Sequence, residues 1–294
     1  MIRSMTGFAR RERAGDFGTL IWEVRSVNHR YLEANVRLPE ELRSAEGEFR
    51  QAIAATVRRG KVDAALQFRP TADSRIMLDF DEAFLDELIA RSHEVSRRAT
   101  AKGGTIASPT ALDLMRWPGV LRDRERDATP LLAVAQEVLA EALTALTASR
   151  ASEGERIGTM LASRCRQIET LVGAVHTRLP EVHARIRARL EERLAQLVLP
   201  GEPNRERLEQ EIALSLARTA VDEELDRLTS HVAEVGSALA GSEPAGRRLD
   251  FLMQEFNREA NTLSSKSLDP ETTRAAVEMK VLIEQMREQV QNVE

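Results

Sequence analysis

The chain is of medium length and poor in aromatic residues. Its 294 residues carry a net charge of −5, and 42% are apolar, enough for a buried core in one large or two ordinary domains. The aromatic share of 4% disfavours a large β-sandwich or barrel and favours packing between helices. The single cysteine, Cys165, excludes an internal disulfide and any multi-cysteine metal site. We see no run of about 18 apolar residues and no signal-peptide core, so we expect neither a membrane span nor secretion.

Charge is unevenly distributed along the chain. Residues 1–70 carry thirteen Lys and Arg against nine Asp and Glu, whereas the whole chain is at −5, so the remainder carries −9. A positive head on an acidic body can bind a polyanion at one place without coating the whole molecule. An ordinary solvated surface is the alternative interpretation.

The first seventy residues predict a small sheet with one helix. A turn is expected at 15–18, and alternating apolar residues predict strands at 20–27 and 31–38, which we expect to pair with each other as antiparallel neighbours. A helix is expected from residue 40 to about 59, and a further strand at 61–68. Together these elements predict a small sheet covered by a helix.

Beyond residue 79 the periodicity predicts helices alone. Shorter helices are expected at 81–101, 109–116 and 128–150. Long apolar stripes typical of helices follow at 157–179, 182–197 and 208–239, with breaks at Pro180 and 200–203. A final pair of helices is expected at 247–263 and 271–292. The fold class is therefore α+β: a small N-terminal antiparallel sheet with helices, followed by a long all-helical region with helical arms and a C-terminal helical pair. We place domains at 1–150, 151–240 and 241–294. The long stripes cannot bury themselves alone, which predicts a homo-oligomer.

Carboxylates on helices are the strongest candidates for chemistry, because the chain lacks the common phosphate-loop, dinucleotide, serine-hydrolase and His-Glu-x-x-His zinc motifs. Glu255 and Glu259 lie one helical turn apart and share one flank, an arrangement suited to oxygen-ligand cations such as Mg²⁺ or Mn²⁺. His231 lies at the border of an apolar stripe, where a histidine is useful for proton transfer near neutral pH. Glu284 and Glu288 form a second such pair. A solvated structural role is the alternative for each.

Basic and aromatic residues near the two ends predict contacts with RNA, through phosphate pairing and base stacking. These candidates are Arg3, Arg10, Arg25, His29, Arg30, Tyr31, Arg247, Arg248, Arg258, Lys266 and Lys280.

Four segments resemble the YicC/YloC-like endoribonuclease family. They are Met1–Arg10 (MIRSMTGFAR), Glu23–Leu32 (EVRSVNHRYL), Arg247–Thr262 (RRLDFLMQEFNREANT) and Ile283–Glu294 (IEQMREQVQNVE). The resemblance implies a bacterial, cytoplasmic endoribonuclease that depends on a divalent metal and acts in RNA turnover, with an α+β N-terminal region and a helical C-terminal region. It also implies a ring-shaped homohexamer in which RNA enters a central opening.

The first hypothesis for function is metal-assisted cleavage of RNA. In it, Glu255, Glu259 and a carboxylate of Glu284 or Glu288 hold Mn²⁺ or Mg²⁺, His231 relays a proton, and Arg258 or Lys280 holds the scissile phosphate. Both hydrolysis and attack by the RNA 2′-hydroxyl remain open. The second hypothesis is an RNA-binding ring or adaptor, chaperone-like, with little or no nuclease activity. A purely structural helical assembly is a third and is disfavoured.

Overall fold

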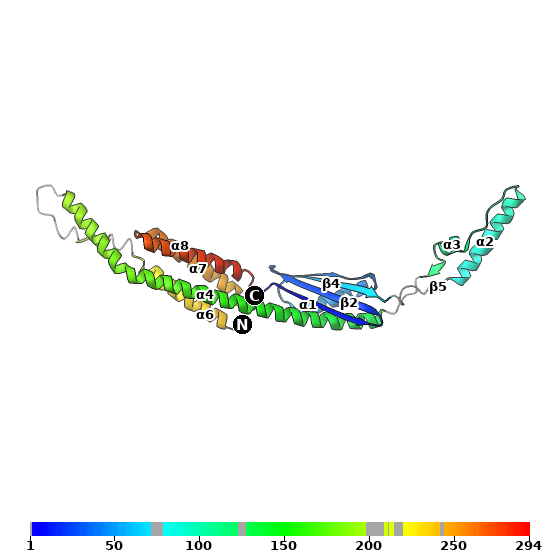
Figure 1. The fold of residues 1–294 in the computed structure, drawn as a ribbon, viewed down its shortest axis with the longest axis horizontal. Helices are drawn as coiled ribbons and strands as arrows, with labels where there is room; N and C mark the ends of the chain where they lie inside the picture. The colour runs from blue at the N-terminus through cyan, green and yellow to red at the C-terminus, as the bar shows by residue number, and fades with distance from the viewer. Residues whose placement is uncertain are drawn as a thin grey trace.

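The computed structural model of the protein describes residues 2–71, 79–122, 128–197, 209–210, 212–214, 220–241 and 244–294. It confirms the α+β fold class. Helix α4 (Thr129–Leu197) runs through most of the molecule, with a four-stranded sheet packed along one half and helices α6, α7 and α8 along the other (Figure 1).

The sheet is mixed rather than purely antiparallel. Its strands are β1 (Gly7–Gly15), β2 (Gly18–Val27), β3 (Leu32–Arg37) and β4 (Gly60–Pro70), in the order β1-β2-β4-β3. The predicted pairing of β2 with β3 is wrong, because β4 lies between them and pairs antiparallel with β2 but parallel with β3. The cause is the connection from β3 to β4, which runs through a helix, and a strand–helix–strand unit makes parallel neighbours.

One face of the sheet forms a core with α1 (Glu46–Thr56) and the start of α4. A short 3₁₀ helix, η1 (Glu40–Ala45), leads into α1. Trp22 on β2 is fully buried, its ring meets that of Phe49 edge-on at 5.3 Å between centroids, and its indole N–H donates to the carbonyl of Ala135 at 2.9 Å. Side chains of β2 alternate between this core and the opposite face, so Arg25 on the opposite face is exposed.

Helix α4 is continuous over 69 residues, so the breaks predicted after residue 150 and at Pro180 are wrong. The predicted domain boundary at 150 therefore lies inside a helix that serves both regions. Proline removes one backbone donor, but the apolar residues before it, such as Val175 and Leu179, are buried in the C-terminal core. Packing of this face favours continuation of the helix. The predicted break at 200–203 lies outside the described residues.

The C-terminal half of α4 packs against α6 (Asp222–Ala240), α7 (Gly246–Lys266) and α8 (Pro270–Val290). Their stripes form one core, in which Leu161, Leu228, Met253 and Phe256 are buried among many others. The premise that the stripes at 157–179 and 221–239 lack a partner within the chain is therefore wrong. A homo-oligomer stays a prediction that rests on the family resemblance alone.

Helix α4 alone among the described residues is long and apolar enough to cross a membrane by length and composition. Its segment Thr129–Arg193 contains an 18-residue window with a mean hydropathy of 1.5, so the expectation that the chain holds no candidate span is corrected here. Apolar side chains near the start of this helix pack against the sheet: Ala135, Val138, Leu139, Ala142, Leu143 and Leu146. Of the apolar window, 39% is buried inside the structure.

Residues 79–122 form a small unit of their own. Helix α2 (Glu82–Ala101) begins after Asp81, whose carboxylate accepts from the backbone N–H of Phe84, and α3 (Ala111–Met115) begins with a capping box. Both agree with the predicted helices at 81–101 and 109–116. Strands β5 (Asp79–Phe80) and β6 (Leu121–Arg122) pair with each other and were not predicted, because two residues leave no alternation to detect.

The two ends of the chain meet at Arg150 and Gly154, in the first half of α4. The backbone of Ser4 pairs with that of Val293, and the buried Arg150 donates through Nε to the carbonyl of Ser4 at 2.7 Å and through Nη2 to Glu294 at 2.5 Å. Gly154 lets the N-terminal segment approach, since a Cβ there would lie 2.3 Å from the carbonyl oxygen of Ile2. This junction gives two of the family-like terminal segments a packing role.

Candidate metal centre and RNA-binding surface

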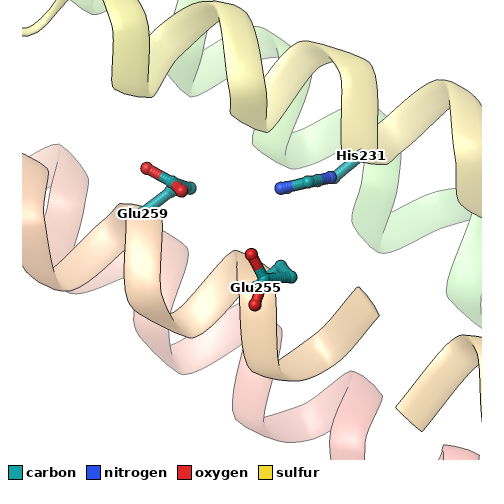
Figure 2. A group of neighbouring side chains, drawn as sticks. All are labelled: His231, Glu255 and Glu259. Carbon is teal, nitrogen blue, oxygen red and sulfur yellow. The ribbon is translucent and has the colours of Figure 1, made fainter. Parts of the chain in front are cut away.

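Helices α6 and α7 place His231, Glu255 and Glu259 in one group, called the α6–α7 site below. One ligand atom from each of the three lies within 4.8 Å of the others. Figure 2 shows the His231 ring from α6 pointing toward the two carboxylates on α7. All three residues were predicted from the sequence, and the structure brings them together.

The imidazole of His231 has no hydrogen-bond partner among the described residues. Both of its ring nitrogens are buried and unpartnered, and the ring meets that of Phe256 edge-on, with 5.5 Å between centroids. An unpartnered buried polar group costs about 1–3 kcal/mol. This orphaned imidazole beside two carboxylates is suited to binding a cation, which would take a nitrogen lone pair.

Glu259 is the most deeply buried of the three residues, with a side chain 3% exposed. Its Oε1 accepts from Nη1 of Arg227 at 3.1 Å, and Nη2 of the same arginine donates to Glu223. The hydrogen bond to Glu259, followed by the charge of Glu223, raises the pKa of Arg227 above its ordinary value. Sequence reasoning missed Arg227, although its place one turn before His231 on the same helix was a usable signal.

A second ion pair, between Lys266 and the buried Glu224, also links α6 and α7. Nζ of Lys266 donates to Oε1 of Glu224 at 2.8 Å, and Glu224 has a side chain 7% exposed. The other oxygen, Oε2, is buried without a partner among the described residues. Lys266, predicted to bind RNA, is thus the counter-ion of a buried carboxylate in this structure.

The second acidic pair does not join the α6–α7 site. Glu284 and Glu288 lie on the exposed side of α8, and Glu284 pairs with Arg287 at 3.5 Å. Neither belongs to a group of three potential ligands within the described chain. Lys280 is also exposed on α8. Helix α8 turns these residues outward because its stripe of Met279, Leu282 and Met286 faces the core.

Of the predicted phosphate-binding arginines, Arg258 lies nearest to the α6–α7 site. Its side chain is 70% exposed, and its Nη1 is 3.9 Å from Oε2 of Glu255. Arg247 and Arg248 lie exposed in the first turn of α7, with Arg248 3.9 Å from Glu234. These positions are open to a substrate.

The outer face of the sheet carries the predicted residues of the positive head. Arg25 lies opposite Phe8 in the β1–β2 register, and Phe8 is 56% exposed. Arg10 pairs with Glu12 at 2.8 Å and with Glu23 at 3.5 Å, so its charge is partly compensated. Phe8 is a candidate that sequence reasoning missed, because alternation alone does not show which face is covered.

The loop between β2 and β3 carries the other predicted head residues. The guanidinium of Arg30 lies over the ring of Tyr31 at 5.2 Å, and Tyr31 is 65% exposed. Nδ1 of His29 is 3.0 Å from the carbonyl oxygen of Tyr31. Arg3 is exposed near the junction of the chain ends. An exposed cation–aromatic pair of this kind is suited to a phosphate and an unpaired base.

The donor set of the α6–α7 site combines an imidazole with two carboxylates. Mg²⁺ prefers oxygen ligands throughout and keeps much of its water, so an imidazole ligand disfavours it. Of the two predicted cations, Mn²⁺ fits these donors better.

Comparison with known proteins covers nearly the whole chain. The family model "Endoribonuclease YicC-like, N-terminal region" matches residues 2–159, and "Endoribonuclease YicC-like, C-terminal" matches 175–294. The chain is 40% identical to "Probable endoribonuclease YicC" of Haemophilus influenzae and 30% identical to the protein of the same name from Clostridioides difficile. Each alignment spans 297 residues and the full length of both chains. The α6–α7 site lies within the C-terminal match.

Proposed function

Because the chain belongs to the YicC-like endoribonuclease family, we propose that it is a divalent-metal-dependent endoribonuclease that cleaves RNA at the α6–α7 site. One observation carries this proposal: a nitrogen of the unpartnered His231 imidazole and one carboxylate oxygen each of Glu255 and Glu259 lie within 4.8 Å of one another. Mn²⁺ is the cation that we favour.

In this proposal each residue of the site has a separate task. Glu255, Glu259 and one nitrogen of His231 would hold the cation, which when bound would polarise a phosphate oxygen and lower the pKa of a water molecule. We assign His231 to the donor set rather than to a proton relay, because both ring nitrogens are shielded from the solvent with which a relay exchanges protons. Arg258, exposed beside Glu255, would orient the scissile phosphate.

The wider setting of the reaction is part of the same proposal. The outer sheet face with Arg25 and Phe8, together with Arg30 and Tyr31, would bind RNA away from the scissile bond. Following the family resemblance, we propose a cytoplasmic homohexamer that acts in RNA turnover.

A cleavage assay tests the proposal. Purified protein is incubated with end-labelled structured RNA in Mn²⁺, in Mg²⁺ or in EDTA, and the product ends are identified. We expect cleavage with Mn²⁺, weaker cleavage with Mg²⁺ and none with EDTA. A 5′-phosphate on the products indicates hydrolysis, whereas a 2′,3′-cyclic phosphate indicates attack by the 2′-hydroxyl.

Variants of the two acidic pairs provide the matched control. Glu255→Gln and Glu259→Gln should each lower cleavage at least a hundredfold while RNA affinity changes little, as expected for residues that hold a catalytic cation rather than the RNA. Glu284→Gln and Glu288→Gln make the same chemical change outside the site and should stay active. Full activity of Glu259→Gln, or cleavage in EDTA, would overturn the proposal. RNA binding without any cleavage would favour the adaptor function.

A further inference from the structure

Arg227 bridges two carboxylates that differ in their exposure to water. Its Nη1 donates to Oε1 of Glu259 at 3.1 Å, and its Nη2 donates to Glu223. The side chain of Glu259 is 3% exposed, that of Arg227 49% and that of Glu223 68%. The guanidinium therefore reaches from a buried metal ligand to the solvent.

The charges of the α6–α7 site explain why an arginine lies here. A carboxylate removed from water needs a compensating positive charge, and Arg227 supplies it to Glu259. A divalent cation held by Glu255 and Glu259 would bring two positive charges to two negative ones. Glu259 would then no longer need Arg227, while Glu223 would still hold the guanidinium at the surface.

Resting on the proposed function, we propose that Arg227 is a positioning residue that serves as the internal counter-ion of Glu259. It holds this carboxylate in place while no cation is bound, and it competes with the incoming divalent cation for it. Once the cation is bound, Arg227 turns away from Glu259 and toward Glu223. Lysine would not substitute fully, because only the fork of the guanidinium contacts both carboxylates at once.

Arg227 could either compete with the cation for Glu259 or only orient Glu259 for it. These two roles predict opposite changes in cation affinity when Arg227 is removed. An outer residue that only orients a ligand lowers metal affinity when it is removed. A competing counter-ion raises metal affinity when it is removed, because the cation no longer has to displace it. The sign of the change therefore distinguishes the two roles without any measurement of cleavage.

The test is calorimetric titration of Mn²⁺ into the full-length protein without RNA. We expect Arg227→Ala to bind Mn²⁺ roughly tenfold more tightly than the wild type, within the usual range of coupling between two sites. Glu223→Gln should bind Mn²⁺ more weakly, because Arg227 then has Glu259 as its remaining carboxylate partner. Arg227→Gln keeps a donor toward Glu259 without the charge, and it should show the same tightening if the alanine variant does not fold.

The matched control is Arg258→Ala, which removes an exposed arginine 3.9 Å from the other carboxylate, Glu255. It should change Mn²⁺ affinity much less than Arg227→Ala. Weaker or unchanged Mn²⁺ binding in both Arg227 variants would overturn the role of Arg227 while leaving the metal site intact. A wild type that binds no Mn²⁺ would instead overturn the proposed function, and this inference with it.

Discussion

Asp269 fastens the start of α8 to α4, and its replacement gives the most direct test of how the C-terminal core is held. Its carboxylate is 3% exposed and accepts from Nε of Arg178 at 2.7 Å and from Nη2 of Arg185 at 3.0 Å. It also caps α8 by accepting from the backbone N–H of Thr272 at 3.0 Å. One buried side chain thus joins two helices and satisfies a helix terminus.

The expected cost of Asp269→Ala follows from these contacts. Loss of a helix cap costs about 1 kcal/mol, and breaking a buried ion pair costs about 3–5 kcal/mol. The two arginines are 32% and 52% exposed and can be rehydrated, which places the total near the lower end, at about 3 kcal/mol. The thermal midpoint should fall by roughly 5–10 °C.

The same contacts predict a pH dependence. The hydrogen bond from Arg178, with those from Thr272, holds the pKa of the Asp269 carboxyl well below its usual range. A lowered pKa in the folded state stabilises the protein above the unfolded value of about 3.9, and this contribution is lost as the pH falls through the folded value. The difference between wild type and Asp269→Ala should therefore be constant from about pH 5 to 8 and shrink below about pH 4.

Thermal denaturation of the wild type, Asp269→Ala and a control measures these effects. The control is Glu271→Gln, which alters an exposed first-turn carboxylate of α8 that pairs with Arg274 at 3.3 Å and should cost less than about 0.5 kcal/mol. Equal midpoints for Asp269→Ala and Glu271→Gln at pH 7 would refute the reasoning, since the buried pair would then contribute no more than a surface pair.

Three further predictions concern the RNA-binding head, the chain junction and the assembly. Replacing Arg25 and Arg30 together by Ala should weaken RNA binding. The slope of log affinity against log salt concentration, measured by filter binding, should become shallower by about 0.7 per lost phosphate contact. An unchanged slope would mean that the head does not contact RNA. Gly154→Ala should destabilise the protein by about 1–3 kcal/mol in urea denaturation, because the new Cβ would lie 2.3 Å from the Ile2 carbonyl oxygen. Its control is Gly173→Ala on the same helix, where the new Cβ meets nothing within 4 Å and should stabilise the protein by about 0.5–1 kcal/mol. Sedimentation should show a homohexamer, and a stable monomer of 32.8 kDa at micromolar concentration would contradict it.

Local spacing was enough to predict part of the site. Glu255 and Glu259 are four residues apart on a helix, so their shared flank follows from helix geometry. The same rule applied equally to Glu284 and Glu288, and spacing cannot tell which flank faces a neighbouring helix. The pairing of α6 with α7 decides this, and it depends on contacts between residues far apart in sequence.

The contact of Arg227 with Glu259 could not be predicted from the sequence, for a related reason. An arginine on the polar flank of an amphipathic helix is ordinarily a solvated residue, and its neighbour Glu223 supplies a common i, i+4 partner. Its contact with Glu259 crosses 32 residues of chain. The misassigned strand pairing has the same origin, because β3 meets its partner β4 only after the chain has passed through α1.

The proposed RNA-binding head and the α6–α7 site are formed by different elements of one subunit. The head residues lie on the sheet and the loop after β2, whereas the site lies between α6 and α7, and α6 packs against α4. The predicted head residues lie nearer to the C-terminal helices than Ala135 does, because a Cβ on Gly7 would lie 2.8 Å from Cγ of Arg150 and Nδ2 of Asn28 donates to the carbonyl of Gln291 at 2.6 Å. In the proposed function the head binds RNA away from the scissile bond, so losing head contacts should raise KM without changing kcat. Loss of a carboxylate at the α6–α7 site should lower kcat without changing KM. The cation that this carboxylate would hold stabilises the transition state of the reacting phosphate.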